Sequence, residues 1–172
     1  MADLVIRPRT EADIPALAEV LAAQRALTRY PMRWPLPFPI EQFIVRSGEL
    51  GAWTAELGDR PVGHVAVLTA DVAIFLEDWQ RAHALGASRL AVLSVLFVHP
   101  DVRRSGLGRR LHDVAVDWMR SHDLAPCLDV VPVHEAATRL YEGAGWREVG
   151  RGRPHWLPEG EPDVVAMVLP VS

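Results

Sequence analysis

The stretch "LAVLSVLFVHPDVRRSGLGRRL", Leu90–Leu111, changes character twice along its length. Its first part, Leu90–Val98, is a nearly continuous apolar run, which is typical of a strand that is covered on both faces. A basic turn with two glycines follows, and from Leu107 onward apolar residues recur at helical spacing. The stretch therefore predicts a strand, a glycine-containing turn and an amphipathic helix, in that order.

The turn before this helix has the properties of a phosphate-binding site. Gly106 and Gly108 have no side chains that would keep a ligand away from the backbone. The first N–H groups of a helix lack partners inside the helix and lie at the positive end of its dipole, which favours anions. Guanidinium groups that can bind phosphate oxygens are added by Arg103, Arg104, Arg109 and Arg110. These residues alone are equally compatible with a helix that merely follows a flexible turn.

Composition limits the class of protein. The chain has 172 residues, 49% of them hydrophobic and 23% charged, which predicts one folded domain over residues 1–172. A net charge of −4 argues against a surface for nucleic acid. No apolar run approaches the roughly 20 residues of a membrane span, and "MADLVIRPRT" lacks a signal-peptide pattern, so we expect a cytoplasmic protein without a membrane partner. The single Cys127, among strand-like neighbours, is expected to be a buried structural thiol.

The rest of the chain alternates between strand and helix patterns. Strands are expected at residues 3–8, on both sides of Gly58-Asp59, at 127–131, and in a closing hairpin of 146–151 and 163–171. Helices are expected at 14–22, 41–46, 71–84 and 135–144, the last closed by Gly145 in a left-handed conformation. The prolines of Tyr30–Pro39 exclude regular helix or central strand there.

Two motifs in this order resemble the GCN5-related N-acetyltransferase (GNAT) superfamily. Arg103-x-x-Gly106-x-Gly108 is similar to the family's loop for the pyrophosphate of acyl-CoA. The segment "HEAATRLYEGAGW", one strand later, resembles a second family motif, with Ala137, Leu140, Tyr141, Gly145 and Trp146 in register. The resemblance covers about Leu90–Trp146. It implies an α/β (α+β) fold: a mixed, mostly antiparallel central sheet flanked by helices, with the strands before and after the loop helix splayed apart.

The resemblance also implies an activity and a cofactor site. The activity is direct transfer of an acetyl group from acetyl-CoA to a primary amine in a ternary complex, with no metal. A small-molecule acceptor is expected; the alternatives are a protein N-terminus or lysine, and a regulatory CoA-binding domain without catalysis. Backbone N–H groups where the strand bulges would stabilise the acyl oxygen. The implied contacts are Leu96, Phe97 and Val98 for the pantetheine arm, and Arg103, Arg104, Ser105, Gly106, Leu107, Gly108 and Arg109 for the pyrophosphate.

Tyr141 and Ser94 are the candidate catalytic residues. By correspondence with the family tyrosine, Tyr141 is the general acid for the departing thiolate, although its spacing alone favours a core tyrosine. Ser94 stands where some relatives carry a His or Glu base; serine can orient a water, or it is simply a small packing residue. If the strand is regular, Ser94 shares a face with Leu96 and Val98.

Other titratable residues are weaker candidates. His134 replaces the usual family Asn, and a coenzyme contact, a base and a helix cap all stay open for it. His64 lies in an apolar strand, which favours a structural imidazole over a base. Residues Glu77, Asp78 and His83 lie on an expected helix and are expected to face solvent, and His99 is expected in a turn. No His, Asp and Glu set has metal-ligand spacing, so no metal is expected.

Two loops are candidates for the acceptor site. Trp34 and Trp156 either wall that site or pack at a homodimer interface. Acidic residues near Trp156 favour a cationic acceptor, whereas Arg29 and Arg33 near Trp34 favour a carboxylate, so charge does not decide between them. The acidic residues are Glu159, Glu161 and Asp163.

Overall fold

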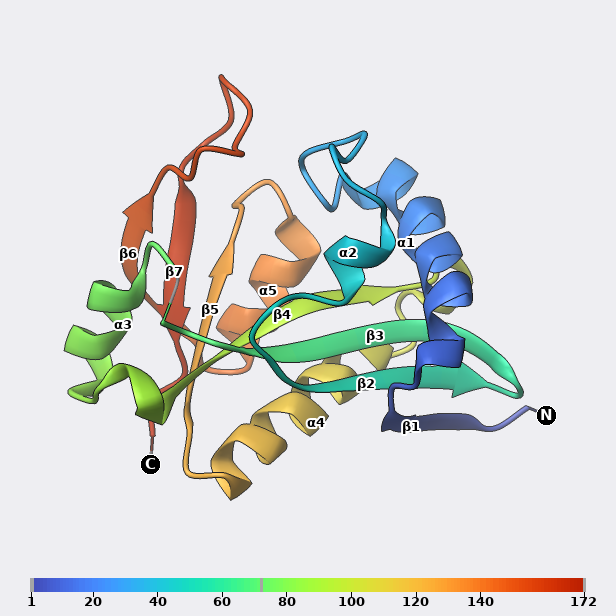
Figure 1. Cartoon of the computed structure of the whole chain (residues 1–172), viewed down its shortest axis with the longest axis horizontal. Helices are drawn as coiled ribbons and strands as arrows, with labels where there is room; N and C mark the ends of the chain where they lie inside the picture. Colours follow the sequence, from blue (N-terminus) through green and yellow to red (C-terminus); the bar gives the residue numbers. More distant parts are fainter. Residues whose placement is uncertain (1, 72, 172) are drawn as a thin grey trace. The chain divides into compact units, whose positions relative to one another are not determined.

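The computed structural model describes residues 2–71 and 73–171 (Figure 1). They form two compact units. Unit 1 contains the chain up to Leu68 together with Leu93–Asp117, and unit 2 contains Thr69–Val92 and the chain from Trp118 onward. The predicted apolar strand Leu90–Val98 therefore contributes residues to both units.

The strands of the described residues form a seven-stranded sheet in the order β1-β2-β3-β4-β5-β7-β6. Their bounds are β1 Leu4–Pro8, β2 Glu49–Leu57, β3 Arg60–Thr69, β4 Leu90–Val98, β5 Ala125–Val130, β6 Arg147–Gly152 and β7 Val164–Val168. Neighbours β1/β2, β2/β3, β5/β7 and β6/β7 are antiparallel, and Leu90–Val92 of β4 pairs in parallel with Ala125–Cys127. The predicted mixed, mostly antiparallel sheet with flanking helices is confirmed.

In unit 1, helices cover both faces of β3. Leu17 and Leu21 of α1 (Ile14–Thr28) pack against Ala66, with Val95 and Phe97 in the same buried cluster. On the opposite face lies α4 (Leu107–Ser121), and a Cβ at Gly63 would be 3.0 Å from Leu111 Cδ1, which explains the glycine at this position. The short helix α2 (Glu41–Ile44) follows the proline segment, which contains neither helix nor strand, as predicted.

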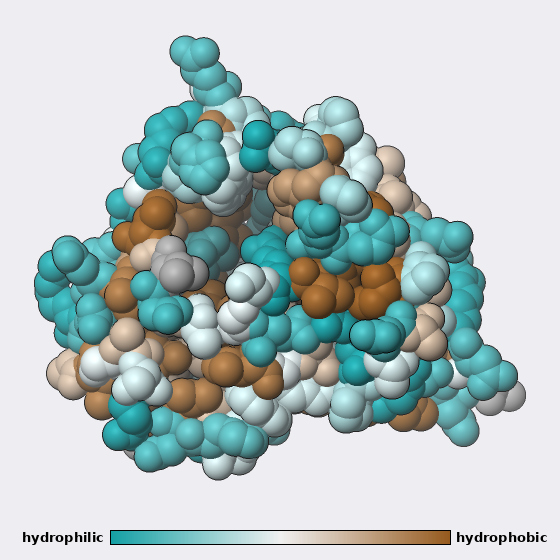
Figure 2. Space-filling view, in the orientation of Figure 1, coloured by the Kyte–Doolittle hydropathy of each residue, from teal (hydrophilic) through white to brown (hydrophobic). Residues whose placement is uncertain are grey.

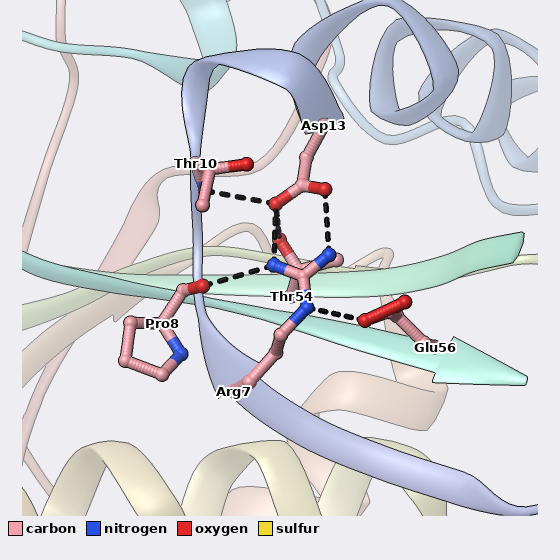
Figure 3. Close-up of polar contacts among 6 residues, drawn as sticks. All are labelled: Arg7, Pro8, Thr10, Asp13, Thr54 and Glu56. Atoms are coloured by element: carbon pink, nitrogen blue, oxygen red, sulfur yellow. Dashed lines mark hydrogen bonds and ion pairs between the residues drawn. The ribbon is translucent and has the colours of Figure 1, made fainter. Parts of the chain in front are cut away.

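A polar cluster ties the beginning of unit 1 together (Figure 3). Arg7 of β1 binds Asp13 at the end of the short 3-10 helix η1 (Glu11–Asp13), and also binds Glu56 of β2. The Asp13 carboxylate accepts two further hydrogen bonds, from the Thr10 N–H at 2.8 Å and from the Thr54 hydroxyl at 3.0 Å. The cluster therefore fixes β1 and the start of α1 to β2.

In unit 2, α3 (Leu76–His83) packs against the β6–β7 hairpin. A Cβ at Gly150 would lie 2.6 Å from the Asp78 carboxyl carbon, and one at Gly152 would lie 2.9 Å from Phe75, so the two glycines permit this approach. Helix α5 (Glu135–Gly143) precedes β6, and Gly145 has φ +99°, which confirms its predicted left-handed conformation.

The predicted helix at 71–84 is too long at its beginning. Ala73 N–H bonds to Ala70 O and Leu76 N–H to Ala73 O, so successive turns occupy the residues before α3. Val72, inside the predicted range, lies outside the described residues. Within residues 2–71 and 73–171, no helix is both long and apolar enough to cross a membrane.

Candidate active site

The turn before α4, in unit 1, has the open backbone expected of the phosphate loop. Gly106 has φ +83° and Arg104 has φ +62°, and the space where a Cβ of residue 106 would project is empty of protein atoms within 4 Å. Ser105 Oγ bonds to Val102 O and accepts from the Leu107 N–H at 3.3 Å, which holds the turn against the helix start. The loop thus offers an anion both backbone N–H groups and unobstructed access.

Arginines surround this turn. Arg103, Arg104, Arg109 and Arg110 are all solvent-exposed. Arg109 Nε donates to Asp113 Oδ1 at 2.9 Å, one helical turn later, so part of its charge is already balanced. The geometry and charge of the loop fit a pyrophosphate, which is an extended anion with many acceptor oxygens.

Strand β4 departs from regular geometry at Val95, in unit 1. Val95 has φ +51°, which is a genuine outlier for a β-branched residue and costs about 1–3 kcal/mol. Ser94, Leu96 and Val98 are still half-buried, while Val95 and Phe97 are buried. The strand is therefore irregular at one residue, just before Leu96, in the region where the family resemblance implies a bulge.

A hydrogen bond from a side chain holds this irregular residue. His64 Nδ1 lies 2.8 Å from the Val95 carbonyl oxygen, and His64 Nε2 lies 3.0 Å from Arg9 Nη1. A carbonyl can only accept and a guanidinium can only donate, so Nδ1 carries the proton and Nε2 accepts. Both nitrogens of the neutral imidazole therefore already have hydrogen-bond partners.

The environment of His64 excludes it as a general base. Burial lowers its pKa to about 4, against a smaller raising effect of its bond to Val95, and the positive charges of Arg9 and Arg46 lower it further. The lone pair that would accept a substrate proton already accepts from Arg9. The prediction of a hydrogen-bonded structural imidazole is confirmed.

Unit 2 carries the second family motif. Tyr141 of α5 is buried, and its ring meets Trp146 edge-on at a centroid distance of 6.0 Å. His134 occupies the N-cap position of α5, where its carbonyl oxygen accepts from the Thr138 N–H at 3.0 Å. Unit 1 thus holds Ser94, Leu96–Val98 and Arg103–Arg109, and unit 2 holds His134 and Tyr141.

Most of the remaining candidate residues bind or pack against other parts of the protein. His83 Nε2 bonds to Pro126 O at 3.0 Å, and Asp78 is half-buried against Gly150, so only Glu77 of these three is solvent-exposed as predicted. His99 caps the short 3-10 helix η3 (Pro100–Val102), as expected of a turn residue. Among the described residues there is no group of three or more His, Cys, Asp or Glu side chains that could hold a metal.

Cys127 lies inside unit 2. Its side chain is fully buried, and burial raises the pKa of its thiol to about 12. The thiolate, which is the reactive form, is therefore scarce at neutral pH. The prediction of a buried structural thiol is confirmed.

Unit 2 also has a pocket of about 200 Å³ on the side of β7 that faces α5. It is lined by Val130, Pro132, Thr138, Glu142, Glu148, Arg151, Val165 and Met167. None of these is a predicted site residue, and Glu148 and Arg151 already pair with each other. The pocket therefore adds nothing to the candidate site.

The two acceptor-loop candidates differ in their internal contacts. In unit 1, Arg25 lies over the Trp34 ring at 5.8 Å, and apolar surface is visible over α1 and α2 (Figure 2). Leu27 of α1 is exposed, as are Trp34 and Phe38 between the two helices and Val45 just after α2. In unit 2, Arg153 bonds to Asp163 at 3.2 Å and to backbone oxygens of Pro158 and Glu161, so it organises the β6–β7 loop and balances part of its acidity.

Comparison with known proteins gives the family. The model of the acetyltransferase (GNAT) family matches residues 20–146. This chain belongs to that family. The match begins well before Leu90 and includes Val95, the Arg103–Arg109 loop and the Tyr141 motif. Members of this family are acyl-CoA-dependent transferases.

Individual GNAT proteins are similar to parts or all of this chain. The [ribosomal protein bS18]-alanine N-acetyltransferase of Escherichia coli K12 is 34% identical over 84 residues, which are 48% of this chain and 57% of that protein. The chain thus spans little more than half the length of the curated relatives it matches. The crystal structure of the E. coli ribosomal-protein-S18-alanine N-acetyltransferase is 22% identical and covers 99% of this chain and 95% of that one, with a TM-score of 0.70. The crystal structure of Arabidopsis thaliana NAA60 in complex with acetyl-CoA is 18% identical and covers 96% of this chain and 97% of that one, also with a TM-score of 0.70. Both structures show the shared fold.

The resemblance implied a bulge in this strand, but the local sequence pattern did not indicate the side chains that hold Val95. A valine inside an apolar strand gives no sign of a positive φ, and Arg9 was not among the candidates. The available signal was a histidine in the apolar strand β3, which needed partners for both ring nitrogens once buried.

Proposed function

We propose that this GNAT protein transfers an acetyl group from acetyl-CoA to a primary amine. The observation that carries the proposal is the Arg103–Arg109 loop, which combines an open left-handed glycine, a helix start and exposed guanidinium groups. These features fit the pyrophosphate of the coenzyme. Acetyl-CoA supplies an activated thioester carbonyl to the reaction.

The residues of the chain have distinct roles in this proposal. The amine nitrogen forms a bond to the acyl carbon, the carbon–sulfur bond breaks, and CoA leaves as a thiol. The Leu96 N–H stabilises the negative charge that develops on the acyl oxygen, an effect worth about 2.7–4 kcal/mol per donor. Tyr141 donates a proton to the departing sulfur and is reprotonated by solvent, and the attacking amine loses its proton to water that Ser94 orients.

The acceptor is proposed to be the α-amine of a polypeptide. The support is the similarity to enzymes that are named as ribosomal protein bS18-alanine N-acetyltransferases. The small-molecule amine expected from the sequence is the alternative, and no contact within either unit selects it. The cytoplasmic location and a homodimer stay predictions.

A panel of acceptors tests both the activity and its substrate class. CoA release would be followed with a thiol reagent, and the acetylated product by mass spectrometry. The panel contains peptides that begin with alanine, the same peptides with a blocked N-terminus, and small primary amines. We expect acetylation of the free peptides and not of the blocked ones. Turnover of small amines alone would overturn the acceptor assignment, and tight acetyl-CoA binding without any turnover would favour the regulatory domain.

A further inference from the structure

The peptide unit that joins Val95 to Leu96 is held from one side. Its carbonyl oxygen accepts from His64 Nδ1 at 2.8 Å. This peptide bond is trans, because the cis bonds of the described residues are Tyr30–Pro31 and Trp34–Pro35. In a planar trans peptide the C=O and the next N–H point in opposite directions. The His64 bond therefore fixes the direction of the Leu96 N–H, which points away from the imidazole.

A series of hydrogen bonds lies behind this peptide, and it runs in one direction from Arg9 onward. Glu49 accepts from Arg9 Nη2 at 2.6 Å, Arg9 Nη1 donates to His64 Nε2 at 3.0 Å, and His64 Nδ1 donates to Val95. Glu49 holds Arg9 in place, and from Arg9 onward the bonds run head to tail. A group that accepts a hydrogen bond becomes a stronger donor, so the imidazole and then the Val95–Leu96 peptide are polarised in turn. The last group in the chain is the Leu96 N–H, on the far side of the same peptide.

Burial makes this chain rigid and keeps water from competing. His64 is 0% exposed, Val95 is 1% exposed and the Arg9 side chain is 9% exposed. The imidazole also stacks on Phe97 at a centroid distance of 5.4 Å and an interplanar angle of 23°. Packing fixes the ring plane, and the two hydrogen bonds fix its rotation. This support explains how a valine with φ +51° persists in the middle of a strand.

We propose that His64 is a positioning residue for acyl transfer, which holds the Val95–Leu96 peptide so that the Leu96 N–H is aimed at, and polarised toward, the acyl oxygen. The inference rests on the proposed function, because it requires that acetyl-CoA binds. It assigns His64 no proton transfer; Arg9 and Glu49 act only through it.

Infrared difference spectroscopy with acetyl-CoA labelled at the acetyl carbonyl carbon tests the proposal without an acceptor. A hydrogen bond from Leu96 lowers the carbonyl stretching frequency of the bound thioester. We expect this shift in the wild-type protein and its loss in His64→Phe, which keeps a ring beside Phe97 but has no donor. His64→Asn, whose side-chain amide can replace Nδ1, should retain part of the shift. Val65→Ala, a buried change on the opposite face of β3, should leave it unchanged.

The outcomes separate the two proposals. If wild-type protein does not bind acetyl-CoA, the proposed function itself fails. If it binds with a shift that His64→Phe keeps in full, the role of His64 is overturned and the proposed function is unaffected. If it binds without a shift, both the role of His64 and the assignment of the Leu96 N–H to the acyl oxygen are overturned, and the acceptor panel still tests acetyl transfer itself. Once an acceptor is identified, His64→Phe should lower kcat by about tenfold or more while the acetyl-CoA dissociation constant changes little.

A measurement on wild-type protein covers the case in which His64→Phe does not fold. Nitrogen-15 spectra of the histidine rings should show His64 neutral with the proton on Nδ1. A scalar coupling across the hydrogen bond should connect His64 Nδ1 to the Val95 carbonyl carbon. A proton on Nε2, or no detectable coupling in the folded protein, would overturn the proposal.

Discussion

The guanidinium of Arg7 and the carboxylate of Asp13 form two parallel hydrogen bonds, Nη2 to Oδ1 at 2.7 Å and Nη1 to Oδ2 at 2.8 Å (Figure 3). The Asp13 side chain is only 6% exposed, so its charge depends on these partners. The bond from Arg7 holds the pKa of Asp13 well below its usual range, against the raising effect of burial. The ion pair connects β1 to the start of α1.

We expect Asp13→Asn to destabilise the protein by about 2 kcal/mol, because Arg7 loses a charge-assisted bidentate partner. The folded-state pKa of Asp13 is depressed, so its stabilisation is present at neutral pH and is lost as the pH falls below the ordinary carboxyl value of about 3.9. Urea unfolding at pH 7 and at pH 3 measures this, with Asp59→Asn in the exposed β2–β3 turn as the control. Equal destabilisation by the two variants would contradict the assignment.

The sequence was informative where structure depends on local pattern. The apolar run Leu90–Val98 and the amphipathic stripe from Leu107 predicted β4 and α4 with their observed starts. It was less informative where backbone geometry depends on distant partners. Val95 takes its left-handed conformation beside His64 of another strand, and Asp78 is half-buried because Gly150, far along the chain, lets α3 approach.

Deprotonation of the amine is expected to need no histidine. Because the pKa of His64 is lowered to about 4 and its Nε2 accepts from Arg9, the rate should rise with pH toward the pKa of the acceptor amine. A kcat/KM profile recorded with two acceptors of different amine pKa checks this. The pH at which kcat/KM stops rising should be higher for the acceptor with the higher amine pKa. A limb near pH 6–7 that is the same for both acceptors would instead identify a base in the protein.

Tyr141→Phe should reduce turnover by about 10²- to 10⁴-fold, because it removes the proposed acid while keeping the ring that packs on Trp146. Acetyl-CoA affinity should change little. Single-turnover acetyl transfer and thermal unfolding would be measured on the same preparation. Trp146→Phe is the matched control, since it weakens the same ring contact but removes no proposed catalytic group. If Tyr141→Phe transfers acetyl at the wild-type rate but has a lowered melting temperature, the role of Tyr141 is purely structural.

The loop that begins α4 carries the proposed coenzyme site. Gly106→Val introduces a branched side chain into the open space beside the helix start, at a residue with φ +83°. Gly160→Val in the β6–β7 loop is a matched control, because Gly160 has φ +87° and equally open surroundings but lies outside the proposed phosphate site. Both variants carry similar backbone strain, so a difference between them reports on the ligand.

Calorimetric titration of acetyl-CoA into the wild-type protein and these two variants is the most direct measurement. We expect acetyl-CoA to bind to the wild type, Gly106→Val to weaken binding at least tenfold, about 1.4 kcal/mol, and Gly160→Val to leave it unchanged. Unaltered affinity in a folded Gly106→Val protein would contradict the claim that the Arg103–Arg109 loop holds the pyrophosphate.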